Sequence, residues 1–356
     1  MASKMSETAG GRQDGSELKT EEVISVLSHY DIGETRSIRV YFRGSSKSPK
    51  ALIESDTGKF ILKRRGPGRD DPRRIVYEHA VHDQLRDSGY PVVEIMHSSR
   101  SKSKVVRASS GIYELFRYVK ASRCEGNPVS VKCCGEALSL FHEKLMEFDE
   151  PSPPVRGFHA ITDIQQHIER YAKTHKSRGR RACRTIIDYY MEAAQKVDQM
   201  GWDQWPKTVV HGDWHPGNVL FGEDGDVLAV LDFDAVRWET RTSDIASAIL
   251  HFGRYVSALR TDEASTWPVN VDASAACALM KGYISKSRHL PTAMEIAAIP
   301  SLIIEALVME TMPVLIQDGQ FAHMDALSTL TEVVSSIERI RSDSGRLISS
   351  LGAIVK

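Results

Sequence analysis

The sequence predicts an α+β protein with two lobes, a small β-rich lobe followed by a larger helical lobe. Through most of residues 37–119 the apolar positions repeat every second residue, which is the period of a half-buried strand. After residue 120 they follow a helical period, apart from a β interruption at residues 208–231. A chain of 356 residues is long enough for two such units, each with its own buried core.

The first lobe is expected to be a small sheet that carries one helix. The Asp-Thr-Gly turn at residues 56–58 separates two apolar runs and predicts a hairpin. Tyr77, Val81 and Leu85 lie on one face of a helix over residues 71–88. Other strands are expected at residues 38–42, 105–106 and 112–119, and a short helix from residue 23.

The boundaries of the lobes follow from these changes of pattern. Residues 1–18 are polar, rich in Gly and Ser and without an apolar period, which is typical of a disordered tail. Residues 19–119 form the predicted first lobe, and residues 120–356 form the second. In the second lobe we expect helices at residues 130–147, 163–171 and 183–198 and after residue 231, and strands at 208–210, 219–221 and 227–231.

The composition excludes several classes of protein. Apolar residues make up 41% and charged residues 26%, which argues against a disordered, collagen-like or fibrous chain. The 46 basic and 47 acidic side chains leave a net charge of −1, which gives no overall attraction to nucleic acid or to an anionic membrane. The odd count of five cysteines, two of them adjacent, predicts reduced thiols and a cytoplasmic protein. No leader-like segment opens the chain, and the most apolar stretch, residues 296–316, holds two prolines and two glutamates, so we expect a buried helix there.

The densest chemical signal is the octapeptide that begins at His211. It reads His-Gly-Asp-Trp-His-Pro-Gly-Asn, and it lies between two predicted strands. Asp213 and Asn218 stand at D-x-x-x-x-N spacing, and Asp232 directly follows the third strand. Phosphoryl-transfer sites use this spacing: one Asp accepts or orients the acceptor hydroxyl, while an Asn and a second Asp hold Mg²⁺ against the nucleotide phosphates. The alternative is a set of exposed loop carboxylates.

This motif, followed by Leu-Asp-Phe-Asp at residues 231–234, resembles the aminoglycoside phosphotransferase and choline kinase family. The family includes homoserine kinase type II and spore-coat kinase-like proteins, and the resemblance covers about residues 25–330. It implies a protein-kinase-like fold with a nucleotide-binding first lobe and an acceptor-binding second lobe. It also implies ATP and Mg²⁺ as cofactors, Asp213 as the catalytic base, and Asn218 and Asp232 as magnesium ligands.

The resemblance implies further nucleotide contacts in the first lobe. Lys63 ends an apolar strand, where a kinase lysine grips the phosphates, and Glu78 on the following helix is its expected partner. The alternative for Lys63 is a solvated charge run, since two arginines follow it. Gly44, Ser45 and Ser46 occupy the place of the glycine-rich loop, although a lone glycine there also fits an ordinary turn.

The strand at residues 113–121 is implied to be the hinge between the lobes. In that register Arg117 offers its carbonyl oxygen and Val119 its N–H to the adenine base, with Phe116 behind the base. An ordinary core strand is the alternative.

Other residues near the motif are expected to support it. Asp244 opens a helix, so capping alone would explain it, but in kinase-like folds an acid here also ties down the catalytic loop. His211 is expected to be a packed, hydrogen-bonded loop residue rather than a proton carrier. Asp234 is a supporting residue and the next metal candidate after Asp232.

A basic run in the second lobe bears on the acceptor. We expect it to be a solvated helix end; the alternative is a site for an anionic acceptor, which would disfavour a polycationic aminoglycoside. Its members are Lys173, His175, Lys176, Arg178, Arg180, Arg181 and Arg184.

The predicted function is ATP- and Mg²⁺-dependent phosphorylation of a hydroxyl group of a small molecule, without nucleic-acid or membrane partners. A homoserine-kinase-like metabolite kinase is favoured, because residues 63–65 and 77–81 resemble that branch more than choline kinase. An aminoglycoside phosphotransferase is one alternative. A nucleotide-binding pseudokinase with a regulatory role is another, favoured by the thin glycine loop and opposed by the intact Asp213, Asn218 and Asp232.

Overall fold

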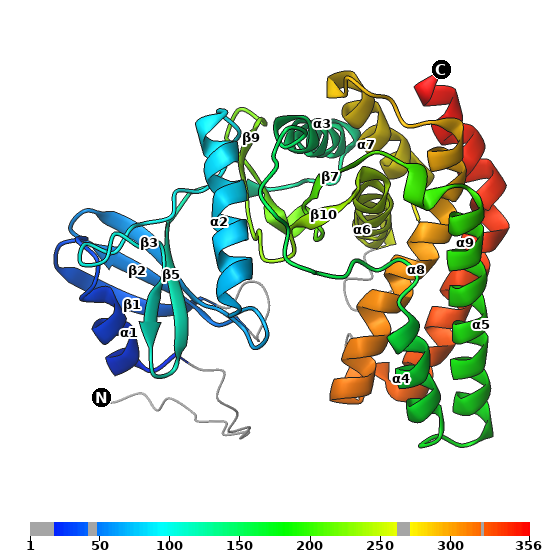
Figure 1. Cartoon of the computed structure of the whole chain (residues 1–356), viewed down its shortest axis with the longest axis horizontal. Helices are drawn as coiled ribbons and strands as arrows, with labels where there is room; N and C mark the ends of the chain where they lie inside the picture. The colour runs from blue at the N-terminus through cyan, green and yellow to red at the C-terminus, as the bar shows by residue number, and fades with distance from the viewer. Residues whose placement is uncertain (1–17, 42–47, 262–270, 322–323) are drawn as a thin grey trace, which may run out of the picture. The chain divides into compact units, whose positions relative to one another are not determined.

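The protein has the α+β composition that the sequence predicts. The computed structural model describes residues 18–41, 48–261, 271–321 and 324–356, and Figure 1 draws their helices and strands. They divide into two compact units, the first ending at Pro72 and resuming over Val93–Val119, the second comprising Arg73–Val92 and Lys120–Lys356. Residues 73–92 thus belong to the second unit, whereas the predicted boundary at residue 119 assigns them to the first lobe. The roles given to the two lobes stay predictions.

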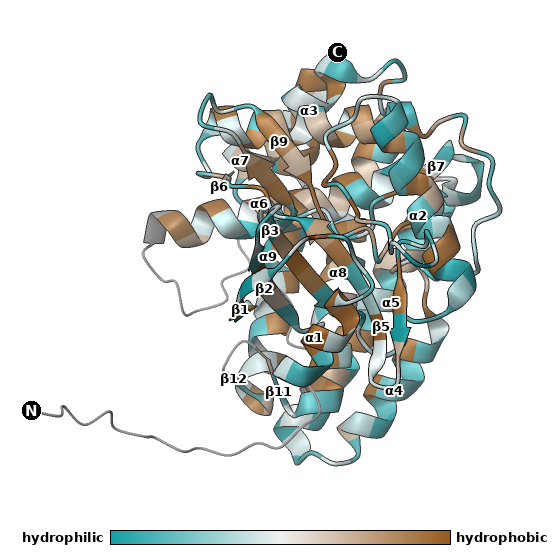
Figure 2. Cartoon of the chain, turned by 90° about the vertical axis from the view of Figure 1, so that its left-hand side faces the viewer, coloured by the Kyte–Doolittle hydropathy of each residue, from teal (hydrophilic) through white to brown (hydrophobic). Residues whose placement is uncertain are grey.

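The first unit is built on one antiparallel sheet with the strand order β1-β2-β3-β5-β4. Its elements are α1 Thr20–Leu27, β1 Thr35–Tyr41, β2 Lys50–Ser55, β3 Gly58–Arg64, β4 Val106–Ala108 and β5 Gly111–Arg117. Ser55 pairs with Gly58, so Asp56 and Thr57 form the predicted hairpin turn. Val23 and Val26 of α1 cover Ile53 and Phe60 in the core of this unit. Figure 2 shows the hydrophobic residues along β2 and β3.

The arginines after Lys63 are not a solvated face. Arg65 and Glu114 form a buried ion pair, with 2.8 Å between Nη1 and Oε1 and side chains only 1% and 3% exposed. Arg64 pairs with Glu22 of α1 at 3.1 Å. Burying a charge is tolerated when a partner of opposite sign accompanies it. The charge run therefore fixes β3 to its neighbours, and Lys63 is itself buried.

The second unit combines long helices with short strands. Its helices are α2 Pro72–Asp87, α3 Pro128–Lys144, α4 Thr162–Ala172, α5 Ser177–Gln199, α6 Arg241–Thr261, α7 Ala273–Lys286, α8 Ala293–Asp318 and α9 Ala326–Val355, with short 3₁₀ turns at Trp202–Gln204 and Pro216–Asn218. Its strands are β6 Ser122–Arg123, β7 Lys207–Val210, β8 Val219–Phe221, β9 Val227–Val230, β10 Arg237–Thr240, β11 Gln320–Phe321 and β12 Met324–Asp325. They pair as β6-β8-β9, β7-β10 and β11-β12.

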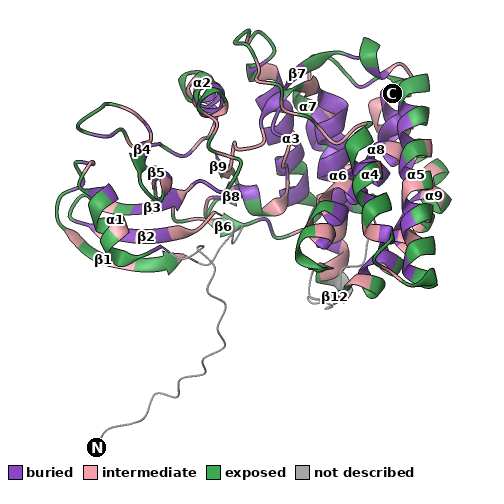
Figure 3. Ribbon diagram, turned by 60° about the horizontal axis from the view of Figure 1, so that its bottom comes forward, coloured by how far each residue is buried: buried purple, intermediate pink, exposed green. Residues whose placement is uncertain are grey.

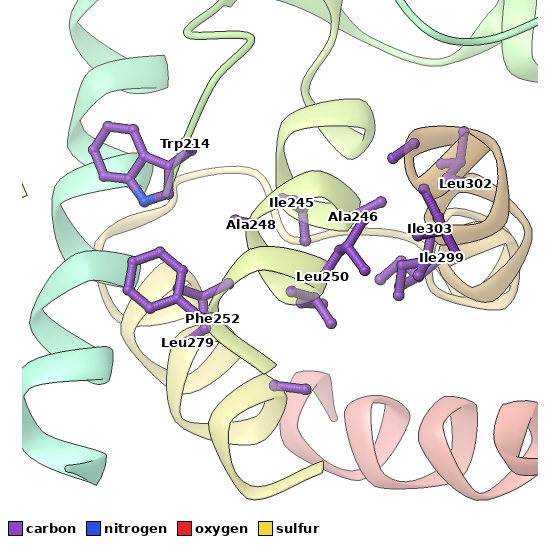
Figure 4. Packing of buried hydrophobic residues seen from close by; sticks show 14 of the residues in the cluster. Trp214, Ile245, Ala246, Ala248, Leu250, Phe252, Leu279, Ile299, Leu302 and Ile303 are labelled. Atoms are coloured by element: carbon purple, nitrogen blue, oxygen red, sulfur yellow. The ribbon is translucent and has the colours of Figure 1, made fainter. Parts of the chain in front are cut away.

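The core of the second unit lies around α6. Figure 3 shows α6 and α7 largely buried, while α5 and α9 carry exposed residues on their outer sides. Figure 4 shows side chains from the neighbouring elements that point into this core, among them Trp214, Ile245, Leu250, Phe252, Leu279, Ile299 and Ile303.

A capping box of Thr292 and Glu295 begins α8. By length and hydropathy α8 could cross a membrane, but 67% of its apolar window is buried inside the protein, as in a core helix.

Two glycines let α3 and α7 approach closely. A Cβ atom on Gly135 of α3 would lie 2.0 Å from the carbonyl oxygen of Leu279, and one on Gly282 of α7 would lie 2.0 Å from that of Lys132. Only glycine leaves room for backbones at this separation. The close crossing brings His142 of α3 next to Tyr283 of α7, and both side chains contribute to the site described below.

Candidate active site

The predicted catalytic loop connects β7 to β8, and its start requires glycine. Gly212 has φ +77°, a backbone conformation that other residues rarely adopt. A Cβ atom there would also lie 2.4 Å from the carbonyl oxygen of Ala235 and 2.2 Å from Nη1 of Arg237. Arg237 lies on β10, which pairs with β7. The turn at Gly212 is therefore packed against the segment that follows Asp232.

Asp244, in the first turn of α6, accepts two hydrogen bonds from the backbone of this loop. Its Oδ2 accepts the backbone N–H of His211 at 2.6 Å, and its Oδ1 accepts that of Gly212 at 2.8 Å. The residue is only 1% exposed. Burial by itself would raise the pKa of this carboxyl, but the hydrogen bond from His142 and the electrostatic attraction of His142, His211 and Arg237 outweigh burial and lower the pKa below its usual value of 3.8. Asp244 is thus an ionised acceptor for the loop backbone.

Asp244 also belongs to a buried hydrogen-bond network that the sequence did not predict. His142 Nε2 lies 3.2 Å from Asp244 Oδ2, and His142 Nδ1 lies 2.9 Å from the hydroxyl of Tyr283. Burial raises the pKa of Tyr283, so its hydroxyl stays protonated and can donate to Nδ1 when that nitrogen carries no hydrogen. His142 then donates from Nε2 to the carboxylate. No local pattern marks His142 in the sequence, because its partners are more than 100 residues away.

His211 is a packed residue with two hydrogen bonds in this loop. Its Nδ1 accepts the backbone N–H of Asp213 at 3.3 Å, and its Nε2 donates to the carbonyl oxygen of Leu231 at 3.0 Å. These two contacts require the neutral tautomer with hydrogen on Nε2. The ring therefore ties the loop that carries Asp213 to the strand end that precedes Asp232.

Asp213, Asn218 and Asp232 converge at one end of the β8–β9 hairpin. Asn218 Nδ2 donates to the carbonyl oxygen of Asp213 at 2.9 Å and lies 3.4 Å from its Oδ2. The backbone N–H of Leu231 donates to the carbonyl oxygen of Asn218 at 2.9 Å. Asp232, the next residue, has φ +62°, which is uncommon for a residue other than glycine. The β8–β9 hairpin thus brings the proposed base and both proposed metal ligands together.

The segment after Asp232 is fixed to α2. Arg74 Nη2 donates to the carbonyl oxygen of Asp234 at 2.6 Å, and Arg74 Nε lies 3.7 Å from Glu78 Oε1. Arg74 did not stand out in the sequence. Lys63 and Glu78 are both buried, but they belong to different units of the chain, so their pairing stays a prediction.

The remaining nucleotide assignments fall on the first unit. Gly44, Ser45 and Ser46 lie outside the described residues. Phe116, on β5, pairs with Ile61 of β3, and a bridge joins it to Ile95 on its other side. Arg117 is the last residue of β5, and its backbone N–H donates to the carbonyl oxygen of Glu94 at 3.0 Å. Residues 118–121, which include Val119, are neither helix nor strand.

The basic run of residues 173–184 lies away from this loop. It occupies the turn between α4 and α5 and the first turns of α5. Figure 1 draws that turn at the lower end of these helices, well below β7 and β10 in this view. This position favours the solvated helix end over an anionic acceptor site.

Comparison with known proteins agrees with this arrangement. Residues 38–276 match the model of the phosphotransferase enzyme family, described under the abbreviation APH. The chain belongs to this family. The resemblance predicted from the octapeptide is thereby confirmed, as is the prediction of a small-molecule kinase at the level of enzyme class.

Two curated relatives of this phosphotransferase are homoserine kinases. That of Zymomonas mobilis subsp. mobilis is 26% identical over 244 residues, which cover 64% of this chain and 69% of the relative. That of Caulobacter sp. is 27% identical over 230 residues, which cover 61% and 65%.

Several solved structures of small-molecule kinases show the same fold as this phosphotransferase. An amicoumacin kinase in complex with AMP-PNP, Ca²⁺ and its ligand has a TM-score of 0.69 and 15% identity, and the match covers 92% of this chain and 94% of that one. A microcompartment-associated aminopropanol kinase has a TM-score of 0.65 and 17% identity, with 95% and 99% covered. An aminoglycoside phosphotransferase from Alicyclobacillus acidocaldarius has a TM-score of 0.65 and 15% identity, with 93% and 96% covered. The predicted kinase-like fold is confirmed.

Proposed function

We propose that this phosphotransferase transfers the γ-phosphoryl group of ATP to a hydroxyl group of a small molecule in a Mg²⁺-dependent reaction. The observation that carries the proposal is the convergence of Asp213, Asn218 and Asp232 at one end of the β8–β9 hairpin. A loop carboxylate without function would not need the buried support that Asp244 and His211 give to this backbone.

Asp213 is the proposed catalytic base. Its side chain is about half exposed, 45%, so that an acceptor can reach it, while its backbone is fixed by His211 and Asn218. In the reaction the acceptor oxygen forms a bond to the γ-phosphorus, and the bond to the bridging oxygen of ADP breaks. The hydroxyl proton passes to the Asp213 carboxylate, and ADP leaves with the electron pair of the broken bond.

The donor set fits a magnesium ion that is shared with phosphate oxygens. Among the described residues no group of three His, Cys, Asp or Glu side chains could hold a metal by itself. Mg²⁺ in kinase sites needs fewer protein ligands, because water and the phosphates complete its shell. Asn218 donates through Nδ2 to Asp213, which leaves the amide oxygen for another partner, and Asp232 supplies a carboxylate. When bound, the ion would neutralise the negative charge of the phosphates.

The nucleotide is proposed to be ATP. The similar amicoumacin kinase was solved with AMP-PNP and Ca²⁺, and spectinomycin phosphotransferase was solved with ADP. For this chain we retain Lys63 and Glu78 as phosphate-binding residues, and Phe116, Arg117 and Val119 as contacts of the base. Gly44, Ser45 and Ser46 remain the proposed phosphate loop.

For the acceptor we propose a metabolite of the homoserine type. The curated relatives named above are homoserine kinases, and their 26–27% identity exceeds that of the antibiotic kinases among the solved structures, which is 15% or less. The basic run lies in the turn between α4 and α5, away from the catalytic loop, so it gives no support to an anionic acceptor. We also propose that the enzyme works in the cytoplasm.

The test is a coupled assay of ADP formation with Mg²⁺ and ATP against L-homoserine, amino alcohols, choline, sugars and kanamycin. We expect turnover with L-homoserine. Asp213→Asn should lower kcat by about 10²–10⁴-fold while ATP still binds, because a positioned base contributes that much. Binding of Mg·ATP without turnover of any hydroxyl compound would instead indicate a pseudokinase. Near-normal kcat in Asp213→Asn would remove this residue from the mechanism.

A further inference from the structure

A strongly basic surface lies at the turn between α4 and α5, away from the predicted catalytic loop (Figure 1). Residues 170–187 contain no Asp or Glu, and their seven Lys and Arg side chains are all exposed. The net charge of the chain is −1, so acidic side chains outnumber basic ones by eight in the rest of it. We call this surface the basic tip, and its members are Arg170, Lys173, Lys176, Arg178, Arg180, Arg181 and Arg184.

The charges of the basic tip are not neutralised by other parts of the described chain. Across residues 18–41, 48–261, 271–321 and 324–356, the seven side chains form no ion pair. Arg170 Nε donates to the carbonyl oxygen of Gln166 at 3.4 Å, and Arg180 Nη2 donates to that of His175 at 3.3 Å. These backbone contacts leave the positive charge in place. The tip therefore presents its charge to the solvent.

This placement costs helix stability. The N-terminus of a helix is the positive end of its dipole, so cations are unfavourable in the first turns. The first turn of α5 has no acidic residue, and its N-cap, Lys176, makes no side-chain capping hydrogen bond. Arg180 and Arg184 are four residues apart, a spacing at which like charges repel each other. Because several neighbouring positions act against the helix, we infer that these charges serve binding rather than folding.

The composition of the tip distinguishes among the anions that it could bind. Among the described residues, no exposed large apolar side chain lies within residues 170–187, so the tip lacks the apolar anchor of a membrane-surface helix. Tyr171 is partly buried against the core and packs against the ring of His175 at 4.5 Å, so the tip lacks an exposed aromatic platform for bases. A long nucleic acid would also extend over the acidic remainder of the chain, which repels it.

We propose that the basic tip docks a short acidic segment of a partner protein. Residues 177–184 of α5 rise by about 10 Å, a length that about three extended residues cover. A few carboxylates in sequence can therefore neutralise the tip without reaching the acidic remainder of the chain. Five of the seven side chains are arginines, whose planar guanidinium binds a carboxylate through two parallel N–H donors. The inference does not depend on the proposed function, because the tip lies away from the catalytic loop.

The experiment measures the binding of labelled peptides to the full-length protein by fluorescence anisotropy, at low and at physiological salt. The probe is a short peptide of alternating Asp and Glu, and its neutral counterpart alternates Asn and Gln. Binding of a short duplex DNA, and of vesicles with equal parts of phosphatidylcholine and phosphatidylserine, is measured alongside. The test variant carries Arg180→Gln, Arg181→Gln and Arg184→Gln together.

We expect the wild type to bind the acidic peptide and not the neutral one. The test variant should raise the Kd for the acidic peptide by about 5- to 100-fold at low salt, because each exposed charge pair contributes up to several-fold. Binding by the wild type should weaken from low to physiological salt, since salt screens exposed charges. In urea denaturation the test variant should be at least as stable as the wild type, because it removes cations from the positive end of a helix. If it does not fold, Lys173→Gln combined with Lys176→Gln replaces it, with an expected rise of about 3- to 20-fold.

A control variant removes the same number of charges elsewhere in the second unit. It carries changes at exposed cations of α3 and α7, namely Lys144→Gln, Lys281→Gln and Lys286→Gln. Its Kd for the acidic peptide should equal that of the wild type. Equal weakening in both triple variants, or no binding of the acidic peptide by the wild type, would overturn the proposal.

The other possible occupants of the tip are distinguished by the same set of measurements. Tighter binding of duplex DNA or of the vesicles than of the acidic peptide would overturn the proposal in favour of a nucleic acid or a membrane. Sedimentation of the protein alone tests for a second copy of this chain. Self-association that the test variant abolishes and the control variant keeps would make that copy the partner and would likewise overturn the proposal.

Discussion

Asp244→Ala should destabilise the second unit strongly, although the residue does not touch the proposed reacting groups. Its carboxylate accepts the backbone N–H groups of His211 and Gly212 and a hydrogen bond from His142, at a position only 1% exposed. Alanine leaves three donors without an acceptor in the interior. Each such donor costs about 1–3 kcal/mol, and removing one partner of a buried charged network costs about 3–5 kcal/mol. We expect a loss of about 3–5 kcal/mol in the free energy of unfolding.

Asp244→Asn keeps the shape of the side chain and separates the contributions. Its amide oxygen can replace one carboxylate oxygen, but its NH₂ group faces a donor where the second oxygen was. The expected loss is about 1–3 kcal/mol, the cost of one unpaired buried donor. Asp163→Ala is the control, because Asp163 forms an exposed pair with Arg156 and should change stability by less than about 1 kcal/mol.

The assay is urea denaturation near neutral pH, combined with amide hydrogen exchange at His211 and Gly212. Both amides should exchange faster in Asp244→Ala than global unfolding alone explains. The pH dependence follows from the lowered folded pKa of Asp244. Its contribution is complete above the usual value of 3.8 and is lost as the pH falls through the folded pKa. This share of the acid-induced loss should be absent from Asp244→Asn. A loss below about 1 kcal/mol in Asp244→Ala, with protected loop amides, would refute the reasoning.

The remaining predictions concern backbone strain and a second buried network. Asp232→Ala and Asp232→Gly should both abolish Mg²⁺-dependent ATP binding by calorimetry, but the glycine variant should be more stable by about 1 kcal/mol, since φ +62° strains only alanine. Gly212→Ala should lower both stability and kcat, because a methyl group would meet Ala235 and Arg237; a fully active, stable variant would contradict this packing. For His159, burial alone would lower the pKa, but Glu305 and Asp198 outweigh it and raise the pKa above 6.5. Its stabilisation is therefore complete below pH 6.5 and lost as the pH rises through the folded pKa, and denaturation between about pH 6 and pH 9 should show a smaller decline in His159→Gln.

Local sequence signals predicted the elements that carry the site. The Asp-Thr-Gly turn gave the β2–β3 hairpin, and the apolar period gave α2 within about one residue of its observed bounds. The strands on either side of the octapeptide were also predicted, since each is a short apolar run. These features depend on neighbours in the sequence, so a single sequence contains them.

Features that depend on distant partners were not predictable in the same way. The strand β10 reads Arg-Trp-Glu-Thr, which has no alternation of apolar residues. It forms because β7 pairs with it and because Arg237 donates a hydrogen bond to Glu239 on one face. Arg65 looked like part of a solvated run, but Glu114 on a neighbouring strand neutralises it in the interior. A buried charge reveals itself only when its partner is known.

The first turn of α6 fixes the backbone of the predicted catalytic loop. Asp244 accepts the backbone N–H groups of His211 and Gly212, which directly precede Asp213. The N-terminal end of α6 is buried, so this contact is held within the core of the second unit. A change at Asp244 should therefore misplace the proposed base and lower kcat more than it raises the KM for the acceptor.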